Sequence, residues 1–482
     1  MNKISCFLPY AGKEQVEKTV NSLQATGLIE EIRLITTDAT LESLPDCEIL
    51  FVDMPYSSAT LKAIANAAKG EYTLLYTKET TLEMGMFALE RMIHILEDSS
   101  AGMVYADHYQ IADGKQSNAP VIDYQFGSLR DDFNFGSLLL FNTEKLKEAA
   151  GHMKSDYNFA GLYDLRLKLS QHSDLVHINE YLYSEVENDT RKSGEKIFDY
   201  VDPKNRDRQI EMEQACTEHL KEIGGYLAPE FKKIEFSAGN FEYEASVIIP
   251  VRNRIRTIRD AIKSVLMQKT DFKYNLIIID NHSTDGTTEA IDEFKDDERV
   301  IHIIPERNDL GIGGCWNMGK CGKFAVQLDS DDVYKDENTL AIMVRAFYEQ
   351  NCAMVVGTYM MTDFNMNMIA PGIIDHKEWT PANGRNNALR INGLGAPRAF
   401  YTPVLREVKV PNTSYGEDYA LGLNFSRQYQ IGRVYDVVYL CRRWDDNSDA
   451  SLDIVKMNGH NLYKDRIRTW ELQARIAMNK NK

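Results

Sequence analysis

Three carboxylates within four residues carry the clearest chemical signal in the chain. Asp329, Asp331 and Asp332 directly follow the strand-like apolar run 324–328. Neighbouring carboxylates repel one another, and a divalent cation relieves this repulsion. Oxygen ligands suit Mg²⁺ or Mn²⁺, and such an ion can bridge two phosphates and stabilise a departing diphosphate. The alternative is an acidic cluster that only caps the helix expected over 337–349.

Two apolar strands further upstream, over 245–250 and 275–280, also end in polar or turn-forming residues. These are Pro250, Val251, Arg252 and Asn253 at the first strand end and Asp280 at the second. Ligands of an open parallel sheet bind beyond the carboxyl ends of its strands. A carboxylate at such a strand end can accept hydrogen bonds from a base or a ribose. Taken alone, a strand–turn–helix segment without a ligand explains this pattern better.

A pair of acids, Glu417 and Asp418, precedes an apolar helical stretch. A general base must be held within reach of the reacting hydroxyl, and one of these carboxylates can play that part. The alternative is again the start of a helix.

Two adjacent arginines and a tryptophan form a fourth group, Arg442, Arg443 and Trp444. Guanidinium groups and an indole ring suit a diphosphate or a sugar, through charge-assisted hydrogen bonds and stacking. A patch of surface salt bridges is the alternative.

The elements that would position these residues follow a repeated order. Strands alternate with helices from residue 4 and again from residue 246. This alternation predicts an α/β fold with mostly parallel sheets flanked by helices. The segment 70–79 also lies over 322–331, with the strand and the residues after it in the same places. Two duplicated domains explain both order and spacing, whereas chance similarity between α/β sheets explains only the pattern.

Together these motifs resemble family 2 glycosyltransferases, which have the nucleotide-diphospho-sugar transferase fold called GT-A. The resemblance covers roughly residues 245–450. It rests on Ile-Ile-Pro-Val-Arg-Asn-Arg, Ile-Asp-Asn-His-Ser-Thr-Asp-Gly-Thr, Leu-Asp-Ser-Asp-Asp, Gly-Glu-Asp-Tyr and Arg-Arg-Trp, in that order. It implies two tandem GT-A-like domains of which the second is catalytic. It also implies a nucleotide site on Pro250, Val251, Arg252, Asn253, Asp280, Asn308, Asn317 and Ser330.

The resemblance assigns roles to the acids and arginines as well. Asp329 and Asp331 would hold the metal and the diphosphate. Asp418, with Glu417 beside it, would be the base of an inverting enzyme. Arg442, Arg443 and Trp444 would contact the diphosphate or the acceptor. The pair Arg443–Trp444 resembles the end of the Gln-x-x-Arg-Trp motif of processive synthases, but Leu440 stands in place of the glutamine, so we do not predict a processive polymerase.

The first domain lacks part of this set, because Thr77-Lys-Glu79 stands at the positions of Asp329-Ser-Asp331. One carboxylate fewer and one added cation weaken the binding of a divalent metal. We predict a degenerate, non-catalytic copy that acts as a scaffold or helps to bind the acceptor; a second active transferase is the rival hypothesis. The predicted boundaries are 1–190 for this copy, 191–244 for a helical linker, 245–450 for the catalytic domain and 451–482 for a basic amphipathic helix.

The composition argues against several classes of protein. Lys and Arg total 55 against 72 for Asp and Glu, a net charge of −17, so a nucleic-acid binder is not expected. No apolar run approaches the ~20 residues of a membrane span. Charges at Lys13 and Glu14 do not fit a signal peptide. Seven scattered cysteines without a Cys-x-x-Cys pair suit a reducing cytosol, so we predict a cytoplasmic protein.

The segment 456–482 is basic, unlike the rest of the chain. A helical stripe of Tyr463, Ile467, Trp470, Ala474 and Met478 would let it lie on an anionic membrane surface at the inner face, near a lipid-linked acceptor. A terminal helix packed on an acidic domain is the favoured alternative.

The sequence as a whole predicts a metal-dependent, inverting hexosyl- or N-acetylhexosaminyl-transferase. It would move a sugar from a nucleotide-diphosphate sugar to a hydroxyl of a glycan or lipid-linked glycan acceptor. UDP is the favoured carrier because the family usually uses it. The alternatives are a bifunctional two-site glycan polymerase and a non-catalytic glycan-binding scaffold. A nucleotidyltransferase would need a glycine-rich loop after the strand 245–250, and residues 251–255 lack those glycines.

Overall fold

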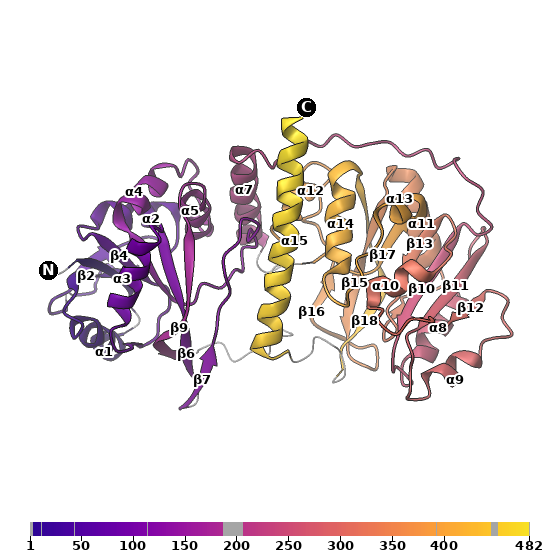
Figure 1. Cartoon of the computed structure of the whole chain (residues 1–482), viewed down its shortest axis with the longest axis horizontal. Coiled ribbons are helices and arrows are strands. Elements are labelled where there is room, and N and C mark those ends of the chain that lie inside the picture. The colour runs from indigo at the N-terminus through magenta and orange to yellow at the C-terminus, as the bar shows by residue number, and fades with distance from the viewer. Residues whose placement is uncertain are drawn as a thin grey trace. The chain divides into compact units, whose positions relative to one another are not determined.

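The computed structural model describes residues 3–10, 12–42, 44–112, 114–186, 206–391, 393–444 and 452–481. The chain divides into two compact units, each with one sheet flanked by helices (Figure 1). The first unit contains Met1–Lys196, Asn205–Gly224 and Leu452–Thr469, and the second contains Ile197–Lys204, Gly225–Ser451 and Trp470–Lys482. Two α/β domains were expected, and this architecture is confirmed. The predicted boundary at residue 190 lies outside the described residues.

Nine strands form the sheet of the second unit, in the order β12-β11-β10-β13-β17-β15-β18-β14 with β16 paired to β15. The four strands from β12 to β13 run parallel, and β17 is antiparallel to both of its neighbours. All of β11 and all but one residue of β10 are buried, as their long apolar runs require. The strands are β10 (Ala245–Val251), β11 (Tyr274–Asp280), β12 (Val300–Ile303), β13 (Phe324–Gln327), β14 (Val333–Tyr334), β15 (Met354–Thr362), β16 (Met368–Ile374), β17 (Arg398–Tyr401) and β18 (Ile431–Arg442).

The sheet of the first unit has the same strand order and directions, β3-β2-β1-β4-β8-β6-β9-β5 with β7 paired to β6. Ile4 pairs with Tyr72 as Ala245 pairs with Phe324, so Thr77 follows its strand as Asp329 does. In both sheets the parallel part comprises four strands and the rest is mixed. The strands are β1 (Ile4–Pro9), β2 (Ile29–Thr36), β3 (Glu48–Phe51), β4 (Tyr72–Tyr76), β5 (Leu82–Met84), β6 (Met103–Ala112), β7 (Lys115–Ala119), β8 (Leu138–Asn142) and β9 (Leu175–Val186).

Helices lie on both faces of each sheet (Figure 1). In the first unit they are α1 (Lys13–Gln24), α2 (Ser58–Ala67), α3 (Ala88–Asp98), α4 (Thr143–Gly151), α5 (Gly161–Ser170) and α7 (Arg206–Glu222). In the second unit they are α8 (Ile258–Leu266), α9 (Thr287–Asp292), α10 (Ile312–Met318), α11 (Thr339–Gln350), α12 (Gly384–Asn387), α13 (Thr402–Val408) and α14 (Glu417–Gln428). Among the helices of the described residues, none is both long enough and apolar enough to cross a membrane.

The last helix, α15 (Ile454–Lys480), buries charged side chains together with Ile467, one residue of the predicted apolar stripe. Arg468 and Arg475 are fully buried, whereas Trp470 of the stripe is 55% exposed. Within the helix, Asp465 Oδ1 lies 2.8 Å from Arg468 Nη1, and Glu471 Oε1 lies 2.7 Å from Arg475 Nε. The buried face of the helix therefore coincides only in part with the predicted stripe, and these ion pairs let the basic side chains enter the interior of the protein. Contact of the stripe with a membrane surface stays a prediction.

Asp465 makes a test of this packing possible. Its carboxylate is fully buried and also accepts a hydrogen bond from Ser128 Oγ at 2.9 Å. Replacing one partner of a buried ion pair leaves the other charge uncompensated and costs about 3–5 kcal/mol. We expect Asp465→Ala to lower the free energy of unfolding of the first unit by about that amount in urea titrations.

The exposed pair Lys456–Asp453 in the first turn of α15 supplies the matched control. Lys456→Ala should change the free energy of unfolding by less than about 1 kcal/mol, as is usual for surface ion pairs. Equal effects of the two substitutions would show that Asp465 does not hold the helix.

Candidate active site

A cavity of about 280 Å³ lies in the second unit, beyond the carboxyl ends of β10 and β13. Residues of α10, β17 and α14 complete its wall. Parallel neighbouring strands end at the same edge of a sheet, so residues that are far apart in sequence meet there. The residues predicted from the sequence that line the cavity are Pro250, Asp329, Ser330, Asp331, Glu417, Asp418 and Arg443.

The three carboxylates after β13 are crowded together. Asp329 Oδ1 accepts a hydrogen bond from the Gln327 side-chain amide at 2.8 Å. Asp332 is buried, and its Oδ1 atom accepts a hydrogen bond from the backbone N–H of Arg442 at 2.7 Å. Burial raises the pKa of Asp329 and of Asp332, and the neighbouring Asp331 carboxylate raises both pKa values further. A cation would therefore stabilise the charged form of the cluster.

Asp329 and Asp331 suit a divalent cation that shares its coordination with a ligand. Within the described part of the chain, no group of three or more His, Cys, Asp and Glu side chains could hold a metal ion by itself. Mg²⁺ is usually held by one or two carboxylates together with phosphate oxygens and water. Two carboxylates that repel each other, completed by the oxygens of a diphosphate, form such a donor set.

Arg442 is buried against the acidic loop and does not line the cavity. Its Nε atom donates to the backbone carbonyl of Asp331, and Nη1 lies 2.9 Å from Oδ2 of Asp260 in α8. The predicted contact of Arg442 with a diphosphate is therefore corrected: this guanidinium positions the acidic loop. The reason is the strand geometry, since neighbouring side chains point to opposite faces and only Arg443 reaches the cavity.

The two acids at the start of α14 have different surroundings. Asp418 Oδ2 accepts a hydrogen bond from Arg398 Nη1 at 2.6 Å. The Oε2 atom of Glu417 is buried and has no hydrogen-bond partner among the described residues. Burial, together with the charge of Asp418, raises the pKa of Glu417 to about 8. At neutral pH the pair thus holds its negative charge on Asp418 and a proton on Glu417.

Arg398, at the start of β17, is a site residue that sequence analysis missed. Burial opposes its charge, but the carboxylates of Asp418 and Asp329 more than compensate and raise its pKa. β17 pairs antiparallel with β13, and this pairing brings Arg398 to the acidic cluster. No motif in the sequence marks that pairing.

Arg254 and Trp316 also line the cavity and were not predicted. The Nε atom of Arg254 lies 3.7 Å from Oδ2 of Asp331. The signal for Arg254 was present, because it directly follows the predicted run that ends at Asn253. Trp316 lies in α10, where no motif in the sequence indicated a wall residue.

Asp280 ends β11 as predicted, but its carboxylate is used inside the fold. It is fully buried, and its oxygens accept hydrogen bonds from the Ser283 backbone N–H at 3.0 Å and from the Thr288 hydroxyl. Burial opposes its charge, but the His302 imidazole, 3.5 Å away, and the hydrogen bonds from Thr288 and Ser283 overcome this effect and lower its pKa. The predicted direct contact with a nucleoside is thus corrected, since Asp280 instead fixes the loop after β11.

Two predicted asparagines likewise hold loops. Asn253 Oδ1 accepts a hydrogen bond from the backbone N–H of Thr284 at 2.8 Å. Asn317 donates to the carbonyl of Val410 at 2.7 Å and accepts from its N–H at 3.1 Å. Val410 lines the cavity, so Asn317 shapes the wall without belonging to it.

The remaining predicted residues lie away from the cavity wall. Val251 is buried in the sheet, and Arg252 and Asn308 are exposed. The Trp444 ring packs against the guanidinium of Arg256, with 4.9 Å between the guanidinium carbon and the ring centroid. The structure therefore does not bring these four predicted residues to the acidic cluster.

Comparisons with known proteins identify this part of the chain. Residues 246–399 match the model of a family described as glycosyl transferase family 2. A relative named an uncharacterized glycosyltransferase, from Rickettsia felis, is 38% identical over 197 residues, which cover 40% of this chain and 31% of the relative.

A second relative is named a GalNAc(5)-diNAcBac-PP-undecaprenol beta-1,3-glucosyltransferase, from Campylobacter jejuni. It is 36% identical over 92 residues, which cover 18% of this chain and 29% of the relative. The chain thus spans less than a third of the length of either relative. Among solved structures, S. aureus TarS 1–349 in complex with UDP-GlcNAc aligns with 18% identity and a TM-score of 0.36, covering 48% of this chain and 71% of that chain.

The raised pKa of Glu417 predicts how stability changes with pH. A carboxyl group whose pKa is near 4.5 when unfolded and about 8 when folded binds more protons in the native state across that range. Its stabilising contribution is complete below about pH 4.5 and is lost as the pH rises through about 8. We expect Glu417→Gln to gain stability relative to the wild type between pH 5 and pH 8.

Urea titrations in EDTA at several pH values measure this difference. Glu407→Gln, on the exposed side of α13, is the control for the loss of one acid from the same unit. A pH-independent difference between Glu417→Gln and the wild type would contradict the burial of a protonated Glu417.

Proposed function

We propose that the chain is an inverting glycosyltransferase whose active site is the cavity of the second unit. It transfers a hexosyl or N-acetylhexosaminyl group from a nucleotide-diphosphate sugar to a hydroxyl of a glycan or lipid-linked glycan acceptor. One observation carries the proposal: within a family 2 region, a single cavity gathers the acids Asp329 and Asp331 with the acids Glu417 and Asp418. A donor that carries a diphosphate and an acceptor that must lose a proton need two such groups.

Asp329 and Asp331 would hold Mn²⁺ or Mg²⁺ against the donor diphosphate. The ion, when bound, supplies Lewis-acid stabilisation of the departing nucleotide diphosphate. Arg443, which lines the cavity, is placed to share the negative charge of the leaving group. Arg442 holds the backbone of Asp331 and so keeps the acidic loop in position.

Asp418 is the proposed base. Its ion pair with Arg398 keeps it charged, and Arg398 also orients the carboxylate. Asp418 removes the proton of the acceptor hydroxyl, whose oxygen attacks the anomeric carbon on the face opposite the leaving diphosphate and inverts it. Glu417, protonated at neutral pH, does not compete for that proton.

The remaining parts of the proposal concern partners and location. UDP is the favoured carrier, and the name of the Campylobacter relative favours a lipid-linked acceptor. All seven cysteines are free, which favours a reducing compartment. We keep cytoplasmic action, with peripheral contact at the inner membrane face, as part of the proposal.

Nucleotide binding tests the donor site without knowledge of the acceptor. Calorimetric titration with UDP and with GDP, each with and without Mn²⁺, should show metal-dependent binding of one nucleotide. UDP is the expected one, with one equivalent per chain, because the first unit has Thr77 and Glu79 in place of the metal-binding acids Asp329 and Asp331. Asp331→Asn should abolish the metal-dependent part. Binding of neither nucleotide would overturn the proposed donor site.

The base is tested by turnover. Asp418→Asn should slow release of UDP from a UDP-sugar by about 10²–10⁴-fold, the usual contribution of a general base, while UDP binding in calorimetry stays nearly unchanged. Glu417→Gln, which keeps a neutral side chain of the same shape, should have a much smaller effect. The reverse ranking of the two variants would assign the base to Glu417.

A further inference from the structure

The first unit contains a cavity of about 400 Å³ at the place that corresponds to the proposed active site. In the second unit the active-site cavity lies after β13, beside α10 and α14. The cavity of the first unit lies after β4, where Thr77 stands, beside the start of α2 and α5. Since the two sheets share one strand order, both cavities are at the same topological position.

The chemistry that would hold a metal and a diphosphate is changed in the first unit. Lys78 follows Thr77, and its Nζ atom lies 3.2 Å from Oε1 of Glu185. The same oxygen lies 3.0 Å from Nε2 of His108. An internal cation thus already neutralises a carboxylate at the place where the second unit has its acidic loop. A nucleotide-diphosphate donor is therefore not the ligand that this cavity fits.

Aromatic rings dominate the wall instead, from Tyr56, Phe133, Phe135, Phe159 and Tyr163. The Phe133 and Phe135 ring centroids are 4.5 Å apart. The guanidinium carbon of Arg166 lies 5.8 Å, 5.4 Å and 4.7 Å from the ring centroids of Phe133, Phe135 and Tyr163, respectively. Such cation–π contacts fix the orientation of the rings.

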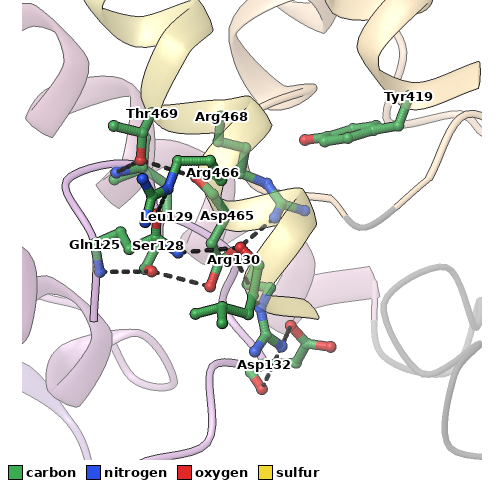
Figure 2. A network of polar contacts seen from close by, with 12 residues as sticks. Gln125, Ser128, Leu129, Arg130, Asp132, Tyr419, Asp465, Arg466, Arg468 and Thr469 are labelled. Carbon is green, nitrogen blue, oxygen red and sulfur yellow. Dashed lines mark hydrogen bonds and ion pairs between the residues drawn. The ribbon is translucent and has the colours of Figure 1, made fainter. Parts of the chain in front are cut away.

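Hydrogen bonds from α5 and α15 hold the loop that carries the cavity residue Asp131, and Figure 2 shows those from α15. From α5, Arg166 Nη1 donates to the carbonyl of Ser128 at 2.9 Å. From α15, the Asp465 carboxylate accepts from Ser128 Oγ at 2.9 Å, and Thr469 Oγ1 accepts from the backbone N–H of Gly127 at 2.9 Å. The loop is thus ordered before any ligand binds.

Phe159 is an exposed ring on a backbone that is held in place. Its side chain is 41% exposed at the rim of the cavity. The Glu211 carboxylate of α7 accepts hydrogen bonds from the backbone N–H groups of Asn158, Phe159 and Ala160 at 2.6–3.1 Å. An apolar ring kept at a rim by three hydrogen bonds is available to cover part of a ligand.

We propose that this cavity binds one uncharged pyranose ring of a glycan. A pyranose has an apolar C–H face that fits against aromatic faces, and hydroxyl groups at its edge that bond to polar side chains. The cavity offers both kinds of group, with Asp131, Asn158 and Thr77 among the rings. That the glycan is the acceptor of the second unit rests on the proposed function, whereas the binding of a pyranose does not.

Saturation-transfer NMR on the full chain in EDTA tests this proposal, with methyl β-glucopyranoside and methyl N-acetyl-β-glucosaminide as the sugars. At least one of them should receive saturation from the wild-type protein. Phe159→Ala should weaken its binding about tenfold, the loss expected for one aromatic contact. Asp131→Ala should also weaken it. Phe51→Ala is the matched control, because that ring is 52% exposed in β3 of the same unit and does not line the cavity.

The remaining outcomes separate the two sites. Asp331→Asn should leave the sugar signal unchanged even if it abolishes nucleotide binding by the second unit. Loss of the signal in Asp331→Asn, or an unchanged signal in Phe159→Ala, would overturn the proposal, because the sugar would then be bound elsewhere. Absence of any signal from the wild type with both sugars would overturn it as well. None of these results depends on transferase activity, so failure of the proposed function would be seen separately.

Discussion

Repulsion among the carboxylates after β13 is the constraint around which the second unit is organised. Three acids in four residues are held at a buried strand end, and burial alone would favour the neutral forms of Asp329 and Asp332. The fold surrounds them with cations and donors drawn from distant segments. Arg442 lies against the loop from the inner side, Arg398 approaches from β17, and Arg254 approaches from the turn after β10. These arginines compensate only part of the charge of the acids, and a charged ligand can compensate the rest.

The same constraint explains why the two units differ although their sheets agree. In the first unit the equivalent strand end carries Thr77, and the lysine beside it is paired with a buried glutamate. Without crowded acids there is no local need for a cation, and the cavity beside α5 is lined by aromatic rings. A shared topology therefore fixes where a ligand can sit, while a few residues at one strand end decide which chemistry that place supports.

The sequence was informative where chemistry and strand position coincide. Apolar runs marked β10, β11 and β13, and the acids after them pointed to the strand edge where the cavity lies. The sequence was uninformative where antiparallel strand pairing decides which residues reach the site. Arg398 is an example, because its strand has no motif of its own. Charged residues misled in α15, because Arg468 and Arg475 look like a solvated face until their acidic partners at positions 465 and 471 are placed. Asp280 was expected to bind a ligand, but a carboxylate at a strand end can instead accept hydrogen bonds from the loop that follows the strand.

The positions of Arg442 and Arg443 at the end of β18 depend on the register of that strand. Arg442 and Arg443 are adjacent, yet one is enclosed with Asp260 and the other lines the cavity. β18 pairs with β15, and the register of this pairing shifts near Thr358. The shift decides which side chains at the end of β18 point into the protein. A slip by one residue that put Cys441 in the place of Arg442 would leave the acidic loop without its buried guanidinium, although composition and charge stayed unchanged. A change in the length of this strand would therefore alter the site even if every side chain were kept.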